Sequence, residues 1–251
     1  MQLTEGQVAE FHETGFLFLA GCLEHARVVE LQRSLETVLG CEGPEVIRES
    51  SGRQAARLVF GAHELSPAMG RLARSSELVE PNRQLLEDDI YLHQSRLNPK
   101  LGLGEGGGWT WHQDYPPWKT IDGMARPDCV VTGVFLDDCT AVNSPLLVIP
   151  GSHHHGLLES RPLTDSASDG YDLHHITTDD VTSLASQHGI EPLIGPAGSV
   201  ALLHCNLVHG SSNNVSPWRR AILYLVYNAV SNACLDETRP WYQNNRDFTP
   251  L

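Results

Sequence analysis

Apolar residues recur with a helical period in the first part of the chain. They fall at helical spacing over residues 28–39, and a glycine follows them as a stop. The segment Thr4-Glu5-Gly6-Gln7 has the spacing of a capping box, which predicts an earlier helix. A short strand is predicted over residues 15–19, and another helix near residues 66–74. Residues 1–88 are therefore expected to form a mostly helical support region.

Beyond this region the pattern changes to short apolar runs of strand length. Glycine and proline turns separate the runs, and strand and helix do not alternate regularly. The pattern predicts a sandwich or jelly roll rather than a Rossmann-like sheet. The expected strands cover residues 89–97, 130–136, 145–149, 199–207 and 221–230.

A polar segment at residues 158–190 interrupts the strands, with an expected helix at 179–188. Such an insertion in a β scaffold is either a lid over a site or a surface loop, and the sequence does not separate the two. The length of 251 residues suits one large β domain. We therefore expect a single domain over residues 1–251, with a jelly-roll core at 89–251.

Composition and charge exclude several classes of function. The net charge is −14 and no basic face is visible, so no nucleic-acid partner is expected. There is no apolar run of about 18 residues, and the first residues lack a basic segment followed by an apolar stretch. We therefore expect neither a secretory signal nor a membrane partner. The six cysteines are scattered without a CxxC pair, as in buried thiols of a reducing compartment. We expect a cytoplasmic monomer or homodimer that acts on a small molecule.

His112 and Asp114 are the central candidates for chemistry. At positions i and i+2 of a strand, an imidazole and a carboxylate point to the same face. His209 follows an apolar run and precedes a turn of small residues, so it is placed to face the same cavity. Two imidazoles and one carboxylate leave adjacent coordination positions open, which is typical of non-haem Fe(II) oxygenases.

An arginine pair lies where the last apolar run begins. A buried guanidinium requires a partner, and its planar fork suits a carboxylate held by two hydrogen bonds. A dicarboxylate co-substrate would supply that partner, and the alternative is a structural salt bridge. Both faces of this run are apolar, so strand parity does not choose between Arg219 and Arg220.

Six ordered motifs resemble the phytanoyl-CoA dioxygenase family, and within it most closely the ectoine hydroxylases. The HxD pair, the later His209-Gly210-Ser211 and the downstream arginine stand in the family order. The resemblance covers residues 89–248, and more loosely the N-terminal helices. Its further motifs lie at residues 91–100 (HQSR-x-N-x-K in the family), 111–118, 122–127, 145–153, 227–233 and 239–240.

The resemblance implies a mainly β fold with flanking helices, a double-stranded β-helix of the cupin-like jelly-roll type. It implies Fe(II) at His112, Asp114 and His209, with 2-oxoglutarate and O2 as co-substrates. Family spacing favours Arg220 as the anchor of the distal carboxylate. The residues assigned to the co-substrate are Arg220, Gln94, Asn98 and Ser211. The residues assigned to the substrate are Trp118, Trp111 and Arg96.

Pro116-Pro117 departs from the family pattern, which has an acidic and a hydroxyl residue there. Two prolines stiffen this loop, so the substrate pocket is expected to differ from that of ectoine hydroxylases. The expected reaction is hydroxylation of an amino acid, an ectoine-like compound or a natural-product intermediate. The alternatives are oxidative cyclisation or desaturation with the same cofactors, a zinc hydrolase and a non-catalytic cupin. The histidines at 153–155, 174–175 and 204 are expected in loops or in packing roles.

Overall fold

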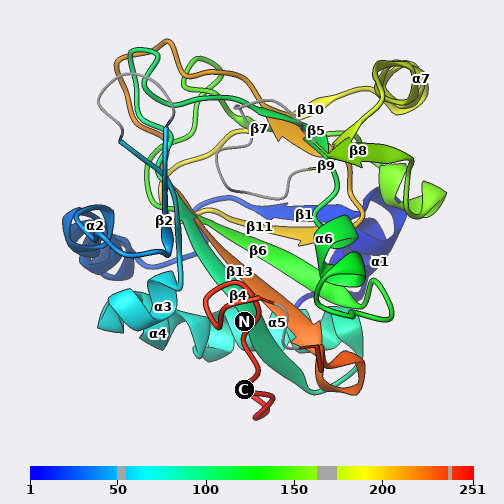
Figure 1. The fold of residues 1–251 in the computed structure, drawn as a ribbon, viewed down its shortest axis with the longest axis horizontal. Helices are drawn as coiled ribbons and strands as arrows, with labels where there is room; N and C mark the ends of the chain where they lie inside the picture. The colour runs from blue at the N-terminus through cyan, green and yellow to red at the C-terminus, as the bar shows by residue number, and fades with distance from the viewer. Residues whose placement is uncertain (50–54, 163–173, 237–238) are drawn as a thin grey trace.

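Two antiparallel sheets form the framework of the chain in a computed structural model, which describes residues 1–49, 55–162, 174–236 and 239–251 (Figure 1). The order across the seven-stranded sheet is β1 (Phe16–Leu19), β11 (Val200–His204), β6 (Cys129–Phe135), β13 (Ile222–Ala229), β4 (Ile90–Asn98), β3 (Ala56–Phe60) and β2 (Val46–Arg48). The order across the six-stranded sheet is β10 (Glu191–Leu193), β7 (Leu146–Val148), β12 (His209–Ser211), β5 (Trp109–His112), β9 (His174–Ile176) and β8 (Ser160–Pro162). These facing sheets confirm the predicted mainly β architecture.

Helices from the first third of the chain cover the outer face of the larger sheet (Figure 1). The predicted capping box is present, because the Thr4 hydroxyl accepts from the Gln7 backbone N–H and the Gln7 side chain accepts from the Thr4 N–H. None of the described helices is both long and apolar enough to cross a membrane. The helices are α1 (Glu5–Thr14), α2 (His25–Leu39), α3 (Ala62–Leu65), α4 (Pro67–Ala73), α5 (Ser76–Leu86), α6 (Tyr115–Thr120) and α7 (Thr178–His188), with 3-10 turns η1 (Ser152–His155) and η3 (Val230–Asn232).

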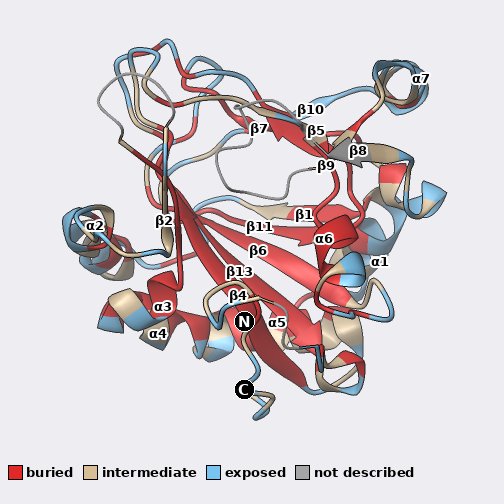
Figure 2. Cartoon of the chain, viewed as in Figure 1, coloured by how far each residue is buried: buried red, intermediate tan, exposed pale blue. Residues whose placement is uncertain are grey.

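Both faces of the larger sheet are buried, as Figure 2 shows for its central strands. On β13, Leu223 and Leu225 pack toward the helices, whereas Ile222, Tyr224 and Val226 pack into the space between the sheets. A strand that is buried on both faces has a continuous apolar sequence rather than an alternating one. This double burial explains why sequence parity did not choose between the two arginines that precede β13.

Two regions differ in detail from the sequence-based expectation. The hairpin of β2 and β3 was not foreseen, and it joins the larger sheet through β3 beside β4. The predicted helix at 179–188 is present as α7, and β8 and β9 extend the smaller sheet. Residues 163–173 of the expected lid or loop lie outside the described residues.

The loop before β5 requires glycine at position 106. Its backbone pairs with Asn214, and a Cβ there would overlap the backbone of Leu101, with the Leu101 nitrogen 2.7 Å away. We expect Gly106→Ala to lower the free energy of unfolding by about 1–3 kcal/mol, as overpacking does. Gly6→Ala is the control, since its Cβ would meet only the Thr4 hydroxyl at 4.0 Å and alanine favours a helix. Equal denaturant midpoints for Gly106→Ala and wild type would contradict this close approach.

His204 is a half-buried histidine that is not one of the predicted metal ligands. Its ring lies 6.5 Å from that of Phe11 and 5.0 Å from that of His153. Burial, followed by the charge of His153, lowers the pKa of His204 to about 4. The unfolded chain, with an ordinary histidine pKa near 6.5, therefore binds one more proton than the folded chain between about pH 6.5 and pH 4.

Stability should accordingly fall as the pH decreases through this window. The contribution of His204 is about 1.4 kcal/mol per pH unit, which is the value of one proton. In His204→Gln the free energy of unfolding should decrease less steeply between pH 6 and pH 4 than in wild type. Denaturant titrations at several pH values measure the two slopes, and identical slopes would contradict the lowered pKa of His204 in the folded chain.

Candidate functional site

Three buried side chains converge between the sheets and could hold a metal ion. One ligand atom from each of His112, Asp114 and His209 lies within 4.8 Å of the other two. The Nε2 atoms of His112 and His209 each lie 3.8 Å from an oxygen of the Asp114 carboxylate. It is the only cluster of this kind among the residues that the structure describes. Two imidazoles and one carboxylate on one side of a centre fit non-haem Fe(II).

The two histidines come from neighbouring strands, but the aspartate does not. His112 on β5 lies opposite His209 on β12. Asp114 lies beyond the end of β5, in helical conformation, as the residue that precedes α6. The backbone N–H groups of Asp114 and Tyr115 both donate to the Cys205 carbonyl, at 3.1 and 3.2 Å, and turn the chain from strand into helix. The expected strand parity of His112 and Asp114 is therefore wrong, although both side chains still reach one point.

Each histidine is oriented by a backbone carbonyl behind it. Nδ1 of His112 lies 2.6 Å from the Thr110 carbonyl oxygen, and Nδ1 of His209 lies 2.9 Å from that of Leu207. A carbonyl can only accept, so Nδ1 carries the proton and the Nε2 lone pair points to the centre. Burial, followed by the charge of His209, lowers the pKa of His112 to about 3. The imidazole is thus neutral and ready to bind a metal.

A cavity of about 410 Å³, open to solvent, surrounds the three candidate ligands. Of the residues that we predicted for co-substrate or substrate, Arg96, Asn98, Ser211 and Arg220 line it. Gln94, Trp111 and Trp118 do not appear among the lining residues; Trp118 is 1% exposed, and Trp111 packs against an apolar cluster around Ile149. The apolar lining residues are Leu58, Trp109, Leu146 and Tyr224.

The structure distinguishes the two arginines before β13. Arg219 forms a two-point ion pair with Asp137, at 2.8 and 3.0 Å. Arg220 is 1% exposed, faces the cavity and bonds only to neutral oxygens, those of Ser144 and Asn98, at 3.0 and 3.4 Å. No carboxylate among the described residues pairs with it. A buried guanidinium without an anion suits an anionic ligand in the cavity.

A second buried cation, Lys100, lies beside Ser211 of the cavity wall and holds its hydroxyl group in place. Lys100 Nζ donates to the Ser211 hydroxyl at 2.8 Å and to the carbonyls of Gly107 and Ser212 at 2.8 and 2.9 Å. Because an ammonium group only donates, the Ser211 oxygen is the acceptor, and its own hydrogen remains available for another partner. Burial, and then repulsion by Arg220 and Arg57, lowers the pKa of Lys100. Ser211 and Arg220 therefore present donors to the same part of the cavity.

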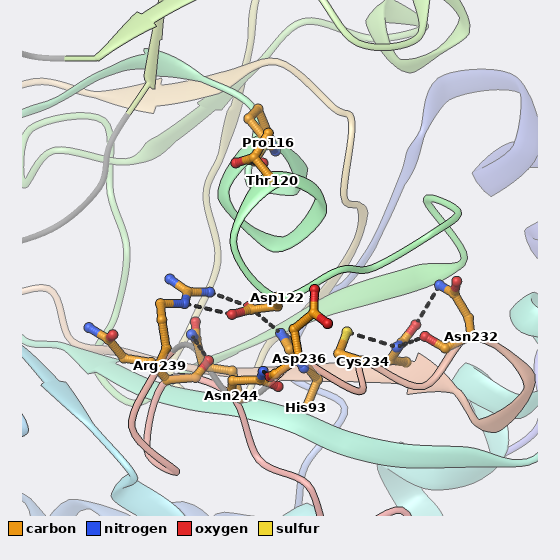
Figure 3. Close-up of polar contacts among 12 residues, drawn as sticks. His93, Pro116, Thr120, Asp122, Asn232, Cys234, Asp236, Arg239 and Asn244 are labelled. Atoms are coloured by element: carbon orange, nitrogen blue, oxygen red, sulfur yellow. Dashed lines mark hydrogen bonds and ion pairs between the residues drawn. The ribbon is translucent and has the colours of Figure 1, made fainter.

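The far end of α6 is attached to the rest of the molecule by a second buried carboxylate. Asp122 accepts two hydrogen bonds from Arg239, one of them 2.7 Å long from Nε, and lies 3.4 Å from Nε2 of His93 (Figure 3). His93 is the extra residue of a bulge in β4, since Gln94 and Leu92 pair with consecutive residues of β13. The helix that follows Asp114 is thus held at both ends.

A family model for phytanoyl-CoA dioxygenase matches residues 11–222. The chain belongs to the phytanoyl-CoA dioxygenase family. Among curated members, an L-proline trans-4-hydroxylase of Streptomyces griseoviridis is 37% identical over 94% of this chain and 91% of its own length. An ectoine dioxygenase of Nocardia farcinica is 34% identical over 98% of this chain and 86% of its own length. The chain is accordingly a non-haem dioxygenase that depends on Fe(II), 2-oxoglutarate and O2, as the sequence predicted.

A solved member of the phytanoyl-CoA dioxygenase family has the same fold. The crystal structure of EctD from S. alaskensis with 2-oxoglutarate and 5-hydroxyectoine superposes with a TM-score of 0.84 at 33% identity, over 97% of this chain and 84% of that chain. The expected double-stranded β-helix is therefore confirmed. Four lining residues that sequence reasoning did not assign to a ligand, Leu58, Trp109, Leu146 and Tyr224, complete the site in this chain. Of these, two carried a signal in the sequence: Trp109 lies three positions before His112, and Tyr224 lies four positions after Arg220.

Proposed function

We propose that this enzyme hydroxylates a small cyclic amino acid or a close derivative, with Fe(II) held by His112, Asp114 and His209. The observation that supports the assignment is Arg220, a buried cation that faces the candidate metal centre without a carboxylate partner among the described residues. 2-Oxoglutarate supplies the missing anion through its distal carboxylate. A zinc hydrolase or a non-catalytic cupin has no use for such a residue.

Different residues of the chain bind 2-oxoglutarate and orient the groups around the candidate metal centre. Bound at the triad, Fe(II) activates O2 for attack on a C–H bond, with 2-oxoglutarate as the reductant. Arg220 and the Ser211 hydroxyl hold the distal carboxylate of 2-oxoglutarate, which sets the direction of the molecule in the cavity. Asn98 orients the guanidinium of Arg220 through its side-chain oxygen, 3.4 Å from Nη1. The carbonyls of Thr110 and Leu207 fix the two histidine rings.

The cavity supports a small substrate. The cavity must hold 2-oxoglutarate and the substrate together, and much of its wall is apolar. Trp109 and Leu58 supply flat apolar surface for a ring, while polar groups remain near the centre. Pro116 and Pro117 form the first turn of α6, so no acidic or hydroxyl side chain from those positions contacts the substrate. We therefore favour a proline-like substrate over ectoine.

Incubation with a panel of substrates, followed by measurement of succinate and of the mass of the oxidised substrate, tests this proposal. The purified enzyme is incubated with Fe(II), 2-oxoglutarate and O2, and with either L-proline or ectoine. We expect succinate release that is strongest with L-proline, and a product that gains one oxygen atom. A product that is lighter than the substrate by two hydrogen atoms would indicate desaturation or ring closure instead of hydroxylation. Succinate formation that no member of the panel stimulates would contradict the substrate class.

Three broader expectations complete the proposal. The enzyme acts in the cytoplasm, as a monomer or a homodimer, and residues 1–251 behave as one domain with residues 158–190 as a lid or loop. Buried free thiols support a reducing compartment, because Cys129, Cys139, Cys205 and Cys234 are all buried without a disulfide. Light scattering measures the oligomeric state, and a single cooperative unfolding transition tests the single domain.

A further inference from the structure

Arg96 forms an ion pair with the one candidate metal ligand that carries a charge. It lies on β4, is 6% exposed, and its Nη2 is 2.5 Å from Oδ2 of Asp114. The side chain of Asp114 is only 2% exposed, so its carboxylate has little water to stabilise the charge. A buried carboxylate is costly unless it is paired and hydrogen-bonded. Arg96 provides both the charge and the hydrogen bond.

The guanidinium of Arg96 is itself held in place. Its central carbon lies 5.5 Å from the ring centre of Tyr224 and 6.0 Å from that of Trp118. Nη1 lies 3.4 Å from the side-chain oxygen of Gln94, two residues earlier on the same strand. A planar group between two aromatic rings and a hydrogen-bond acceptor has little freedom to rotate. Arg96 therefore presents Nη2 to Asp114 in a fixed direction.

Each of the three candidate ligands is oriented by a hydrogen-bond partner on the side away from the metal centre. The Thr110 carbonyl lies behind His112, and the Leu207 carbonyl lies behind His209. Arg96 is the corresponding partner of Asp114, and it holds one carboxylate oxygen while Oδ1 lies 3.8 Å from Nε2 of His112. Outer partners of this type typically change metal affinity by about 10–100-fold when they are removed.

We infer that Arg96 is a positioning residue for the metal site, which orients the Asp114 carboxylate before the metal binds, and not primarily a substrate contact. This role differs from the substrate role that the family position suggested. It rests on the proposed function, since it requires Asp114 to be a metal ligand. Gln94 and Trp118, which our sequence analysis placed at co-substrate and substrate, contribute by fixing Arg96.

Anaerobic Fe(II) titration without 2-oxoglutarate or substrate tests the inference directly. We expect Arg96→Gln to bind Fe(II) about 10–100-fold more weakly than wild type. Arg96→Lys should recover part of the loss, because it keeps the charge but not the planar fork. Arg219→Gln is the matched control: it removes an arginine from an Arg–Asp pair outside the cavity, and it should retain wild-type affinity.

A second measurement separates positioning from a general loss of folded protein. The visible charge-transfer band of the Fe(II)·2-oxoglutarate complex should shift in position in Arg96→Gln and remain unshifted in Arg219→Gln. Partial unfolding lowers the height of the band without moving it. If Arg96→Gln does not fold, the same two measurements on Arg96→Lys decide the question, because its charge is retained.

Two results would overturn the inference in distinguishable ways. Wild-type Fe(II) affinity and an unshifted band in Arg96→Gln, beside a rise in the KM for substrate, would make Arg96 a substrate contact and leave the metal site intact. Wild-type Fe(II) affinity in Asp114→Asn would overturn the ligand assignment, and with it the proposed function and the role of Arg96. Weak binding in both Arg96→Gln and Asp114→Asn supports the inference.

Discussion

Asp114→Asn is expected to abolish turnover, with a loss of at least about 10³-fold, because a metal centre contributes several kcal/mol to the transition state. Asparagine has nearly the same shape as aspartate, so the change removes the negative charge with little change in volume. The same change leaves the buried Arg96 without its carboxylate. The metal-free variant should therefore be less stable by about 3 kcal/mol, as when one partner of a buried ion pair is removed.

Asp137→Asn is the matched control for Asp114→Asn. Asp137 also pairs with an arginine and accepts the Ala221 backbone N–H, but it does not line the cavity. The control should lose stability and retain Fe(II) affinity. Succinate release and anaerobic Fe(II) titration measure both effects. Asp114→Asn with wild-type turnover would show that the carboxylate is not a ligand.

Arg220→Met is expected to weaken 2-oxoglutarate binding by about 10²-fold or more, since hydrogen bonds to charged groups contribute about 1.5–3 kcal/mol each. Methionine keeps much of the volume of arginine and removes the charge, so the shape of the cavity around position 220 should change little. Fe(II) affinity should not change, because Arg220 bonds to Ser144 and Asn98 and not to a candidate ligand. Titration of the charge-transfer band with 2-oxoglutarate gives the affinity.

Arg219→Met distinguishes the anchoring arginine from its neighbour. Arg219 pairs with Asp137 and does not line the cavity, so its removal should leave 2-oxoglutarate binding within about twofold of wild type, which is under 1 kcal/mol. Arg219→Met and Arg220→Met remove neighbouring arginines, of which only Arg220 lines the cavity. Equal effects from both would contradict the assignment of Arg220.

Spacing and motif order pointed to three candidate metal ligands that converge in the structure, although one geometric premise of that prediction was wrong. It assumed that Asp114 continues the strand of His112, whereas the Cys205 carbonyl ends that strand and begins α6. The bond to Cys205 joins residues about 90 positions apart, and no local pattern reports it. The motif order was independent of this local geometry, and therefore it remained informative.

The cavity wall was less accessible to prediction than the ligands. Leu58 lies on a hairpin whose strand β3 joins the sheet beside β4, and this long-range pairing has no signal near residue 58. The family resemblance assigned Trp111 and Trp118 to the substrate, but of the three tryptophans near the metal motif only Trp109 lines the cavity. Trp109 and Trp111 lie two positions apart on β5, so strand alternation does not separate them, and Trp118 lies on α6.

The candidate site is divided between the two sheets. The two candidate histidine ligands lie on β5 and β12 of the smaller sheet, while Arg96 and Asn98 lie on β4 of the larger sheet and Arg220 lies two residues before β13. The apolar core between the sheets, with residues such as Val148 and Val226, keeps them apart. The length of the acceptable 2-oxo acid is consequently a property of this core. If Arg220 holds the distal carboxylate as proposed, we expect a dicarboxylate one carbon shorter than 2-oxoglutarate to fall short of Arg220 and one that is a carbon longer not to fit. Core substitutions remote from any candidate ligand should then alter this selectivity.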